Sequence, residues 1–118
     1  MTIRVISFYT TEDGKTPVAD FLNTLSSQQA RKVTWVLKLV QEQEKVPSSY
    51  FKNLVSTEEI WEVRVQSGSD IFRLLGFFDG SSLIVLNHAF QKKTQKTPSK
   101  AIRLAEKRRR DYLNRRIP

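Results

Sequence analysis

The chain has 118 residues, of which 39% are hydrophobic and 27% charged, and this composition is typical of a single globular domain spanning residues 1–118. It contains no cysteine, which excludes disulfides, thiolate metal sites and a cysteine nucleophile. The formal net charge is +8, which favours a polyanionic partner: nucleic acid, an anionic membrane or an acidic protein.

The first predicted element is a strand over residues 3–9. The N-terminal sequence has no basic segment followed by an apolar stretch, so we expect no signal peptide. The longest apolar run is far shorter than the ~20 residues of a membrane-spanning helix. We therefore expect a cytoplasmic protein that does not enter a membrane.

Two helices are predicted next. A threonine–proline pair at residues 16–17 supplies a helix cap and a first helical residue, which opens a short helix that runs to Leu25. Ser26 and Gln29 match a capping box, and apolar residues at helical spacing then predict a helix that ends near Lys45. A tight connection between the two helices predicts an antiparallel helical hairpin.

The hydrophobic period changes to two in the second half of the chain. Residues 59–66 alternate, with Trp61, Val63 and Val65 on one face and Glu62, Arg64 and Gln66 on the other. Residues 70–78 and 82–90 predict two more strands joined by a hairpin turn, and a last helix is expected over 98–115. The order β-α-α-β-β-β-α predicts an α+β fold. In it, a curved antiparallel sheet has its helices packed on one face, namely the N-terminal helical hairpin and a basic C-terminal helix.

Two arginines stand in the middle of predicted strands. Arg64 and Arg73 belong to consecutive strands, so both guanidinium groups are expected on one solvated face of the sheet. One interpretation is a concave phosphate-binding surface, because the planar donor fork of arginine binds phosphate oxygens bidentately. The alternative is two solvated cross-strand positions, each stabilised by a carboxylate such as Glu62 or Asp70.

The single histidine and the two tryptophans have simpler interpretations. His88 lies near the end of the third sheet strand, where either a packed residue or a catalytic one is possible. Its ordinary pKa suits a general base at neutral pH. Trp35 and Trp61 lie on predicted core faces and are interpreted as packing residues.

The positive charge is concentrated at the C-terminal end, since residues 92–118 carry 11 basic and 2 acidic side chains. Lys92, Lys93 and Lys96 precede the predicted N-terminus of the last helix, where backbone N–H groups favour an anion. A solvated loop is the alternative interpretation. The further cations expected to bind RNA are Lys100, Arg103, Lys107, Arg108, Arg109 and Arg110.

The last helix has a short apolar stripe, so we expect its N-terminal half to pack and its C-terminal half to project. Its charges suit an RNA backbone, ribosomal RNA or an acidic protein, and the sequence does not choose among these. No glycine-rich phosphate loop, paired catalytic carboxylates or metal-ligand spacing is present. We therefore expect no metal and no other cofactor.

Four motifs resemble the phage-derived HigB-like branch of the RelE superfamily of toxins. They are Asp13-Gly14-Lys15-Thr16-Pro17-Val18 with Phe21-Leu22, then Trp61-Glu62-Val63-Arg64, then Phe72-Arg73-Leu74 before Phe77-Phe78, and residues 88–98. The resemblance implies the toxin of a type II toxin–antitoxin system, a metal-independent endoribonuclease that cleaves mRNA. It also implies action on the ribosome, and neutralisation by a helix-turn-helix, HigA-like antitoxin with which the toxin forms a heteromeric complex.

The resemblance matches the RNA-cleaving arginines of the family to Arg64 and Arg73, and its basic segment to Lys92, Lys93 and Lys96. A C-terminal catalytic tyrosine used by some members has no clear counterpart. The implied chemistry is attack of the RNA 2′-hydroxyl on the adjacent phosphorus, stabilised by Arg73 with help from Arg64.

In that mechanism Lys92 or Lys93 serves as proton donor or second charge clamp, and His88 is the candidate general base. Two rival functions remain open on the same fold. One is a non-catalytic nucleic-acid-binding protein, and the other is an interaction protein whose basic helix binds an acidic partner.

Overall fold

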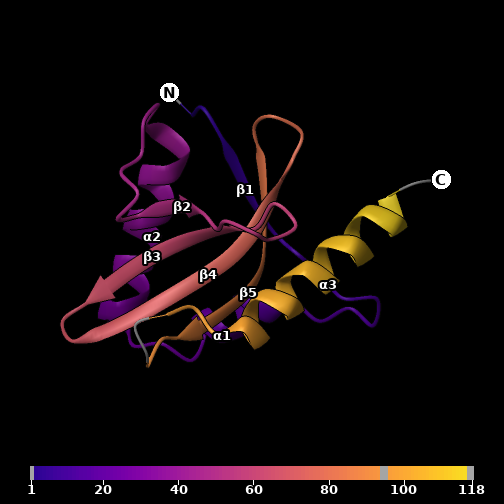
Figure 1. Cartoon of the computed structure of the whole chain (residues 1–118). Helices are drawn as coiled ribbons and strands as arrows, with labels where there is room; N and C mark the ends of the chain where they lie inside the picture. The colour runs from indigo at the N-terminus through magenta and orange to yellow at the C-terminus, as the bar shows by residue number, and fades with distance from the viewer. Residues whose placement is uncertain (1, 94–95, 117–118) are drawn as a thin grey trace.

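The computed structural model describes residues 2–93 and 96–116. In these residues the fold is α+β, with three helices and a mixed five-stranded sheet of order β1-β5-β4-β3-β2 (Figure 1). The elements are β1 (Val5–Phe8), α1 (Pro17–Leu22), α2 (Ser27–Glu42), β2 (Phe51–Asn53), β3 (Trp61–Ser67), β4 (Asp70–Asp79), β5 (Leu83–Gln91) and α3 (Ser99–Arg116). No helix of this described part is long and apolar enough to cross a membrane.

The predicted helical hairpin is confirmed, including its capping box. The Ser26 hydroxyl accepts a hydrogen bond from the Gln29 backbone N–H at 3.2 Å, and the Gln29 side chain accepts one from the Ser26 N–H at 3.0 Å. Both helices end three residues earlier than expected. α1 ends at Leu22 in a tight turn, and α2 ends at Glu42 because Gln43 is extended.

The sheet is not wholly antiparallel, so that part of the prediction is wrong. β3, β4 and β5 pair antiparallel as expected, but β1 pairs with β5 in parallel, from Val5 with Leu83 to Phe8 with Leu86. A parallel pair needs a long crossover, and here the intervening helices and strands supply it. The short β2, which was not predicted, pairs with β3 at the opposite edge.

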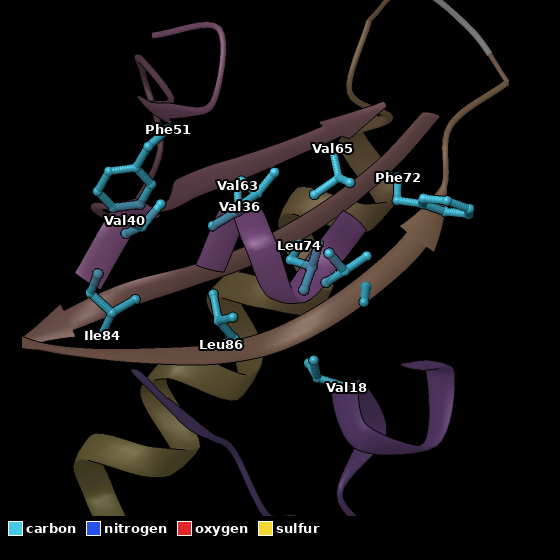
Figure 2. Packing of buried hydrophobic residues seen from close by; sticks show 12 residues of the cluster. Val18, Val36, Val40, Phe51, Val63, Val65, Phe72, Leu74, Ile84 and Leu86 are labelled. Atoms are coloured by element: carbon cyan, nitrogen blue, oxygen red, sulfur yellow. The ribbon is translucent and has the colours of Figure 1, made fainter. Parts of the chain in front are cut away.

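The main core lies between the sheet and the helical hairpin (Figure 2). It confirms the alternation in β3, since Val63 and Val65 are at most 1% exposed. The core residues labelled in the figure are Val18, Val36, Val40, Phe51, Val63, Val65, Phe72, Leu74, Ile84 and Leu86. The hydrophobic pattern of the sequence therefore identifies correctly the face that packs against the helical hairpin.

The two tryptophans differ. Trp61 packs against the core as predicted, with its ring stacked on Phe51 at 4.7 Å between centroids. Trp35 is 49% exposed, so its assignment to the core is wrong. It lies beside the buried stripe of α2, with its ring edge-on to Tyr50 at 5.9 Å and the Lys32 ammonium 4.6 Å from its centroid.

The second face of the sheet is covered by α3, which corrects the expectation that helices pack on one face only. Ala101 and Ala105 pack against Ile60 and Leu75. A bulge at Asn87 shifts the register between β4 and β5, and the Asn87 amide donates to the Ala105 carbonyl oxygen at 2.9 Å. The bulge thus turns a buried amide toward α3 and holds the helix against the sheet.

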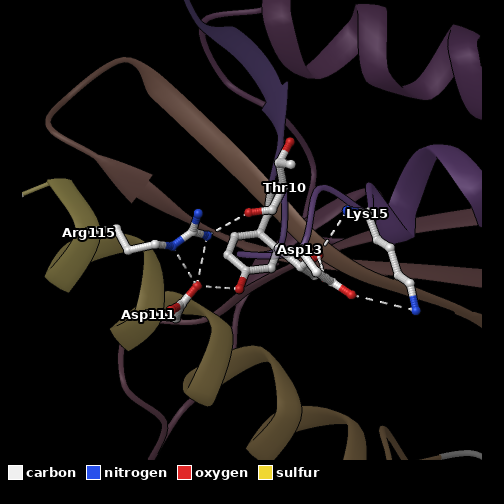
Figure 3. Close-up of polar contacts among 7 residues, drawn as sticks. Thr10, Asp13, Lys15, Asp111 and Arg115 are labelled. Atoms are coloured by element: carbon white, nitrogen blue, oxygen red, sulfur yellow. Dashed lines mark hydrogen bonds and ion pairs between the residues drawn. The ribbon is translucent and has the colours of Figure 1, made fainter.

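The C-terminal half of α3 also packs, so the prediction that it projects is wrong. The Tyr112 ring lies 5.3 Å from the Phe77 ring, and its hydroxyl donates to Asp79 at 2.7 Å. Asp111 accepts hydrogen bonds from the Tyr9 hydroxyl at 2.5 Å and from Arg115 at 2.9 Å (Figure 3). These polar contacts hold the last turns of the helix, and the sparse apolar stripe does not reveal them.

Candidate functional site

Arg64 and Arg73 lie directly opposite each other in the register of β3 and β4. Directly opposed residues of antiparallel strands project from the same face, so the two guanidinium groups are neighbours there. The prediction placed this face in solvent, but in the structure it is the face that α3 covers. Arg73 is only 9% exposed there. Arg64 is more accessible, with 28% of its side chain exposed.

Both arginines are held by Glu62, which is completely buried. Its Oε1 accepts a hydrogen bond from Arg64 Nε at 2.8 Å and lies 3.5 Å from Arg73 Nε. Its Oε2 accepts a hydrogen bond from the Thr97 hydroxyl. A carboxylate is costly to bury unless it is paired, and these contacts supply the pairing. In return, Glu62 fixes the two arginines and binds Thr97 just before α3.

The sequence suggested Glu62 as one possible partner of the arginines but not its burial. The other suggested carboxylate, Asp70, accepts hydrogen bonds from Gln29 at 3.0 Å and Gln91 at 3.2 Å. The useful signal is the spacing, because a glutamate two positions before Arg64 in a strand lies on the same face.

Arg73 retains donor capacity that the fold does not use. Its Nη1 donates to the Phe72 carbonyl oxygen at 3.3 Å, but its buried Nε has no hydrogen-bond partner among the described residues. Burial lowers the pKa of the Arg73 guanidinium from its ordinary value, although Glu62 opposes this shift and Arg64 adds to it. A buried and incompletely paired cation is stabilised by an anion placed against it.

Lys92 completes the cluster at the end of β5, where its backbone N–H donates to the Ile71 carbonyl oxygen at 2.7 Å. Burial lowers the pKa of its ammonium group, and the charges of Arg73 and Arg64 lower it further, against the opposing effect of Glu62. Three cations therefore share one carboxylate. Such an arrangement favours a bound anion and makes Lys92 a readier proton donor.

Lys93 and Lys96, the remaining lysines predicted in this segment, are both exposed. Between them, residues 94 and 95 lie outside the described part of the chain. Thr97, just before α3, makes a long-range contact, since its hydroxyl donates to Glu62. Thr97 therefore links the carboxylate that holds the arginine pair to the start of α3.

His88 lies on the same face but farther from the arginine pair. Phe90 is directly opposite Arg73, whereas His88 is opposite Leu75 and stacks on Phe90 at 5.3 Å between ring centroids. Burial, and next the charge of Arg108, lower the pKa of His88 from 6.5 to about 4. The imidazole is therefore neutral at pH 7 and a weak base there.

The cations of α3 that were predicted to bind RNA fall into two groups. Arg108 donates to the Asn87 carbonyl oxygen at 2.8 Å, Arg109 to Glu59 at 3.0 Å and Arg110 to Glu58 at 2.5 Å. The loop before β3 thus supplies carboxylates that partly neutralise the arginine run. The second group lies exposed on one helical face, at positions i, i+3 and i+7, and consists of Lys100, Arg103 and Lys107; we call it the α3 stripe.

No three histidine or carboxylate side chains in residues 2–93 and 96–116 lie close enough together to hold a metal ion. The groups that the fold does bring together are two opposed arginines, a half-buried lysine, a buried glutamate and a threonine. Such a site is suited to binding an oxyanion and stabilising charge on it.

Fold and site together define a small α+β protein whose sheet carries a paired-arginine cluster beneath the start of its last helix. The model of the family described as "Phage derived protein Gp49-like (DUF891)" matches residues 20–110, and the chain belongs to this family. The matched segment includes every residue of the cluster. No curated protein matches the chain.

Proposed function

We propose that this protein is the toxin of a type II toxin–antitoxin pair, an mRNA interferase of the HigB-like branch of the RelE toxins. The observation that carries the proposal is the opposed pair Arg64 and Arg73, anchored on buried Glu62 beside Lys92. Membership of the Gp49-like family, whose members are RelE-like and toxin-like, supports it.

The proposed reaction uses the RNA itself as nucleophile. The 2′-oxygen attacks the adjacent phosphorus, the bond to the 5′-oxygen breaks, and the products are a 2′,3′-cyclic phosphate and a 5′-hydroxyl. Arg73 and Arg64 stabilise the charge that develops on the nonbridging oxygens. Lys92 is the proposed proton donor to the leaving 5′-oxygen, because its lowered pKa eases transfer. No metal ion takes part in this scheme.

Removal of the 2′-hydroxyl proton is assigned to His88 as a weak base. Its pKa of about 4 limits the rate enhancement that it supplies. Translating ribosomes are the proposed place of action, with the α3 stripe bound to RNA backbone, and a helix-turn-helix antitoxin is the proposed partner.

The test is induction of the chain without a partner protein. Incorporation of labelled amino acids is expected to fall within minutes of induction, and to stay high when Arg73→Ala is expressed at the same level. Unimpaired translation at a confirmed level of the unaltered protein contradicts the toxin assignment.

Two observations favour the second candidate, a nucleic-acid-binding protein without catalysis. Arg73 is almost fully buried against Glu62, and the pKa of His88 is low for a general base. The same geometry then serves affinity alone. Cleavage of RNA by the purified protein, with or without ribosomes, separates the two functions.

A further inference from the structure

A pocket of about 450 Å³ opens at the edge of β3, next to the arginine pair. β2 pairs with β3 only over Trp61–Val63, and the Tyr50 carbonyl oxygen then accepts the Arg64 backbone N–H at 2.8 Å. The pocket begins where this short strand pairing stops. Its volume lies within the range of about 300–1,000 Å³ that is typical of small-molecule sites.

The lining of the pocket is cationic. It contains three basic side chains and several hydrogen-bonding groups, but no carboxylate, and consists of Lys32, Ser49, Tyr50, Arg64, Val65, Gln66, Ile71 and Arg73. The two arginines also belong to the candidate active site. A ligand in the pocket therefore reaches the same guanidinium groups as the proposed scissile phosphate.

An aromatic group forms part of the wall and rim. Tyr50 lines the pocket, and its ring meets the half-exposed ring of Trp35 edge-on. Lys32 also lines the pocket and places its ammonium 4.6 Å from the Trp35 centroid. Aromatic rings beside a cationic groove are the combination with which proteins bind single-stranded nucleic acid, through base stacking and phosphate contacts.

We propose that this pocket is a nucleotide subsite for single-stranded RNA. The phosphate lies against Arg64 and Arg73, the base of the adjoining nucleotide lies against Tyr50, and Lys32 contacts the backbone charge. The proposal rests on the proposed function, since it names where the substrate of that function is held. It also explains the exposed Trp35, which supports the tyrosine from outside.

The probe for this subsite is a single-stranded trinucleotide with 2′-O-methyl sugars, which cannot be cleaved, and three copies of it that each lack one base. At low salt the unaltered protein is expected to bind the intact probe about five- to a hundredfold more tightly than one of the abasic probes. In Tyr50→Leu, which keeps apolar bulk without a ring, that ratio is expected to fall close to one. In Tyr50→Phe it is expected to persist, and this variant keeps the test decisive if Tyr50→Leu fails to fold.

A charge variant separates the phosphate contact from the base contact. Lys32→Gln is expected to weaken binding of intact and abasic probes by the same factor. Lys38→Gln, on the same helix but facing away toward β1, is the matched control and is expected to change neither. Equal binding of intact and abasic probes, loss of the ratio in Tyr50→Phe, or no binding of the intact probe overturns the subsite. If Arg73-dependent arrest of translation is still observed, the subsite alone is wrong; if it is absent too, both proposals are wrong.

Discussion

The buried carboxylate of Glu62 contacts two arginines, and it accepts a hydrogen bond from Arg64 Nε at 2.8 Å. The same carboxylate binds Thr97 at the entrance to α3. One side chain therefore fixes the direction of both guanidinium groups and the position of the helix above them. The first prediction follows from this arrangement.

Replacement of Glu62 by glutamine is expected to destabilise the fold by about 3–5 kcal/mol, because Arg73 is left buried without a counter-charge. The free energy of unfolding is measured by urea denaturation. Glu59→Gln is the matched control, since Glu59 pairs with Arg109 while its side chain is 81% exposed, and it is expected to cost at most about 1 kcal/mol. Equal losses in the two variants contradict an anchoring role for Glu62.

Substitution of Arg73 is expected to lower the single-turnover cleavage rate by roughly 10²–10³-fold with a much smaller change in affinity. The physical reason is that charge on the phosphate increases only in the transition state. Arg73→Lys is the informative variant, because it keeps the charge but loses the planar donor fork. A Lys variant with the unaltered rate rules out bidentate stabilisation at this position.

The α3 stripe is expected to behave in the opposite way. Exchange of Lys100, Arg103 and Lys107 for alanine is predicted to weaken RNA binding and to lower the slope of log affinity against log salt by about 2, at roughly 0.7 per contact with single-stranded RNA. Salt-dependent binding measures the slope, and cleavage of saturating RNA is expected to continue at the original rate. A salt slope that does not change places the RNA elsewhere on the surface.

His88 makes the stability depend on pH in a defined direction. The unfolded chain binds a proton at the ordinary pKa of 6.5, whereas the folded chain binds it only near pH 4. As far as His88 is concerned, the free energy of unfolding is therefore highest above pH 6.5 and declines as the pH falls toward 4. With allowance for partial exposure, the effect of His88 is expected to lower the free energy of unfolding by about 1–2 kcal/mol at pH 5 relative to pH 7.5.

Urea denaturation at the two pH values measures this cost, and His88→Gln is expected to show a smaller difference between them. Because the variant keeps all carboxylates, their protonation cancels in the comparison. The same pH dependence in both proteins means that His88 is not held in its neutral form by the fold.

Metal independence is tested on the ends of the cleaved RNA. With ribosomes present and their magnesium retained, the 2′-hydroxyl mechanism is expected to leave cyclic-phosphate or 3′-phosphate ends beside 5′-hydroxyl ends. Enzymatic end-labelling distinguishes these products. Fragments with 3′-hydroxyl ends require a different nucleophile and a different site.

The features that could be predicted from the sequence are those that depend on local periodicity. The capping box at Ser26 and the alternation of Val63 and Val65 place the hairpin and the core face. The same period of two puts Arg64 and Arg73 on one face. Each of these inferences uses residues within a few positions of one another, where backbone geometry alone decides which way a side chain points.

The features that were missed depend on contacts between distant segments. Nothing near Val5 indicates a parallel partner at Leu83, because alternation does not encode strand direction. The burial of Glu62 involves the distant Arg73 and Thr97, and the bulge at Asn87 is recognisable only once its amide meets Ala105. The hydrophobic pattern of α3 was misleading for a related reason. Its second half is held by hydrogen bonds to distant residues, such as that of Tyr112 to Asp79, and not by an apolar stripe.

The attachment of α3 has a consequence for the order of events during synthesis. The helix follows all five strands in the chain, yet it contacts residues as distant as Tyr9 through Asp111. A nascent chain that has emerged only as far as β5 therefore exposes Leu75 and Phe77 to solvent, together with an uncovered Glu62 carboxylate. We expect a chain that stops after Lys93 to accumulate in the insoluble fraction, and sedimentation of the expressed fragment measures this. The arginine cluster is then assembled only after the start of α3 has been made, because Thr97 binds the carboxylate that holds both arginines.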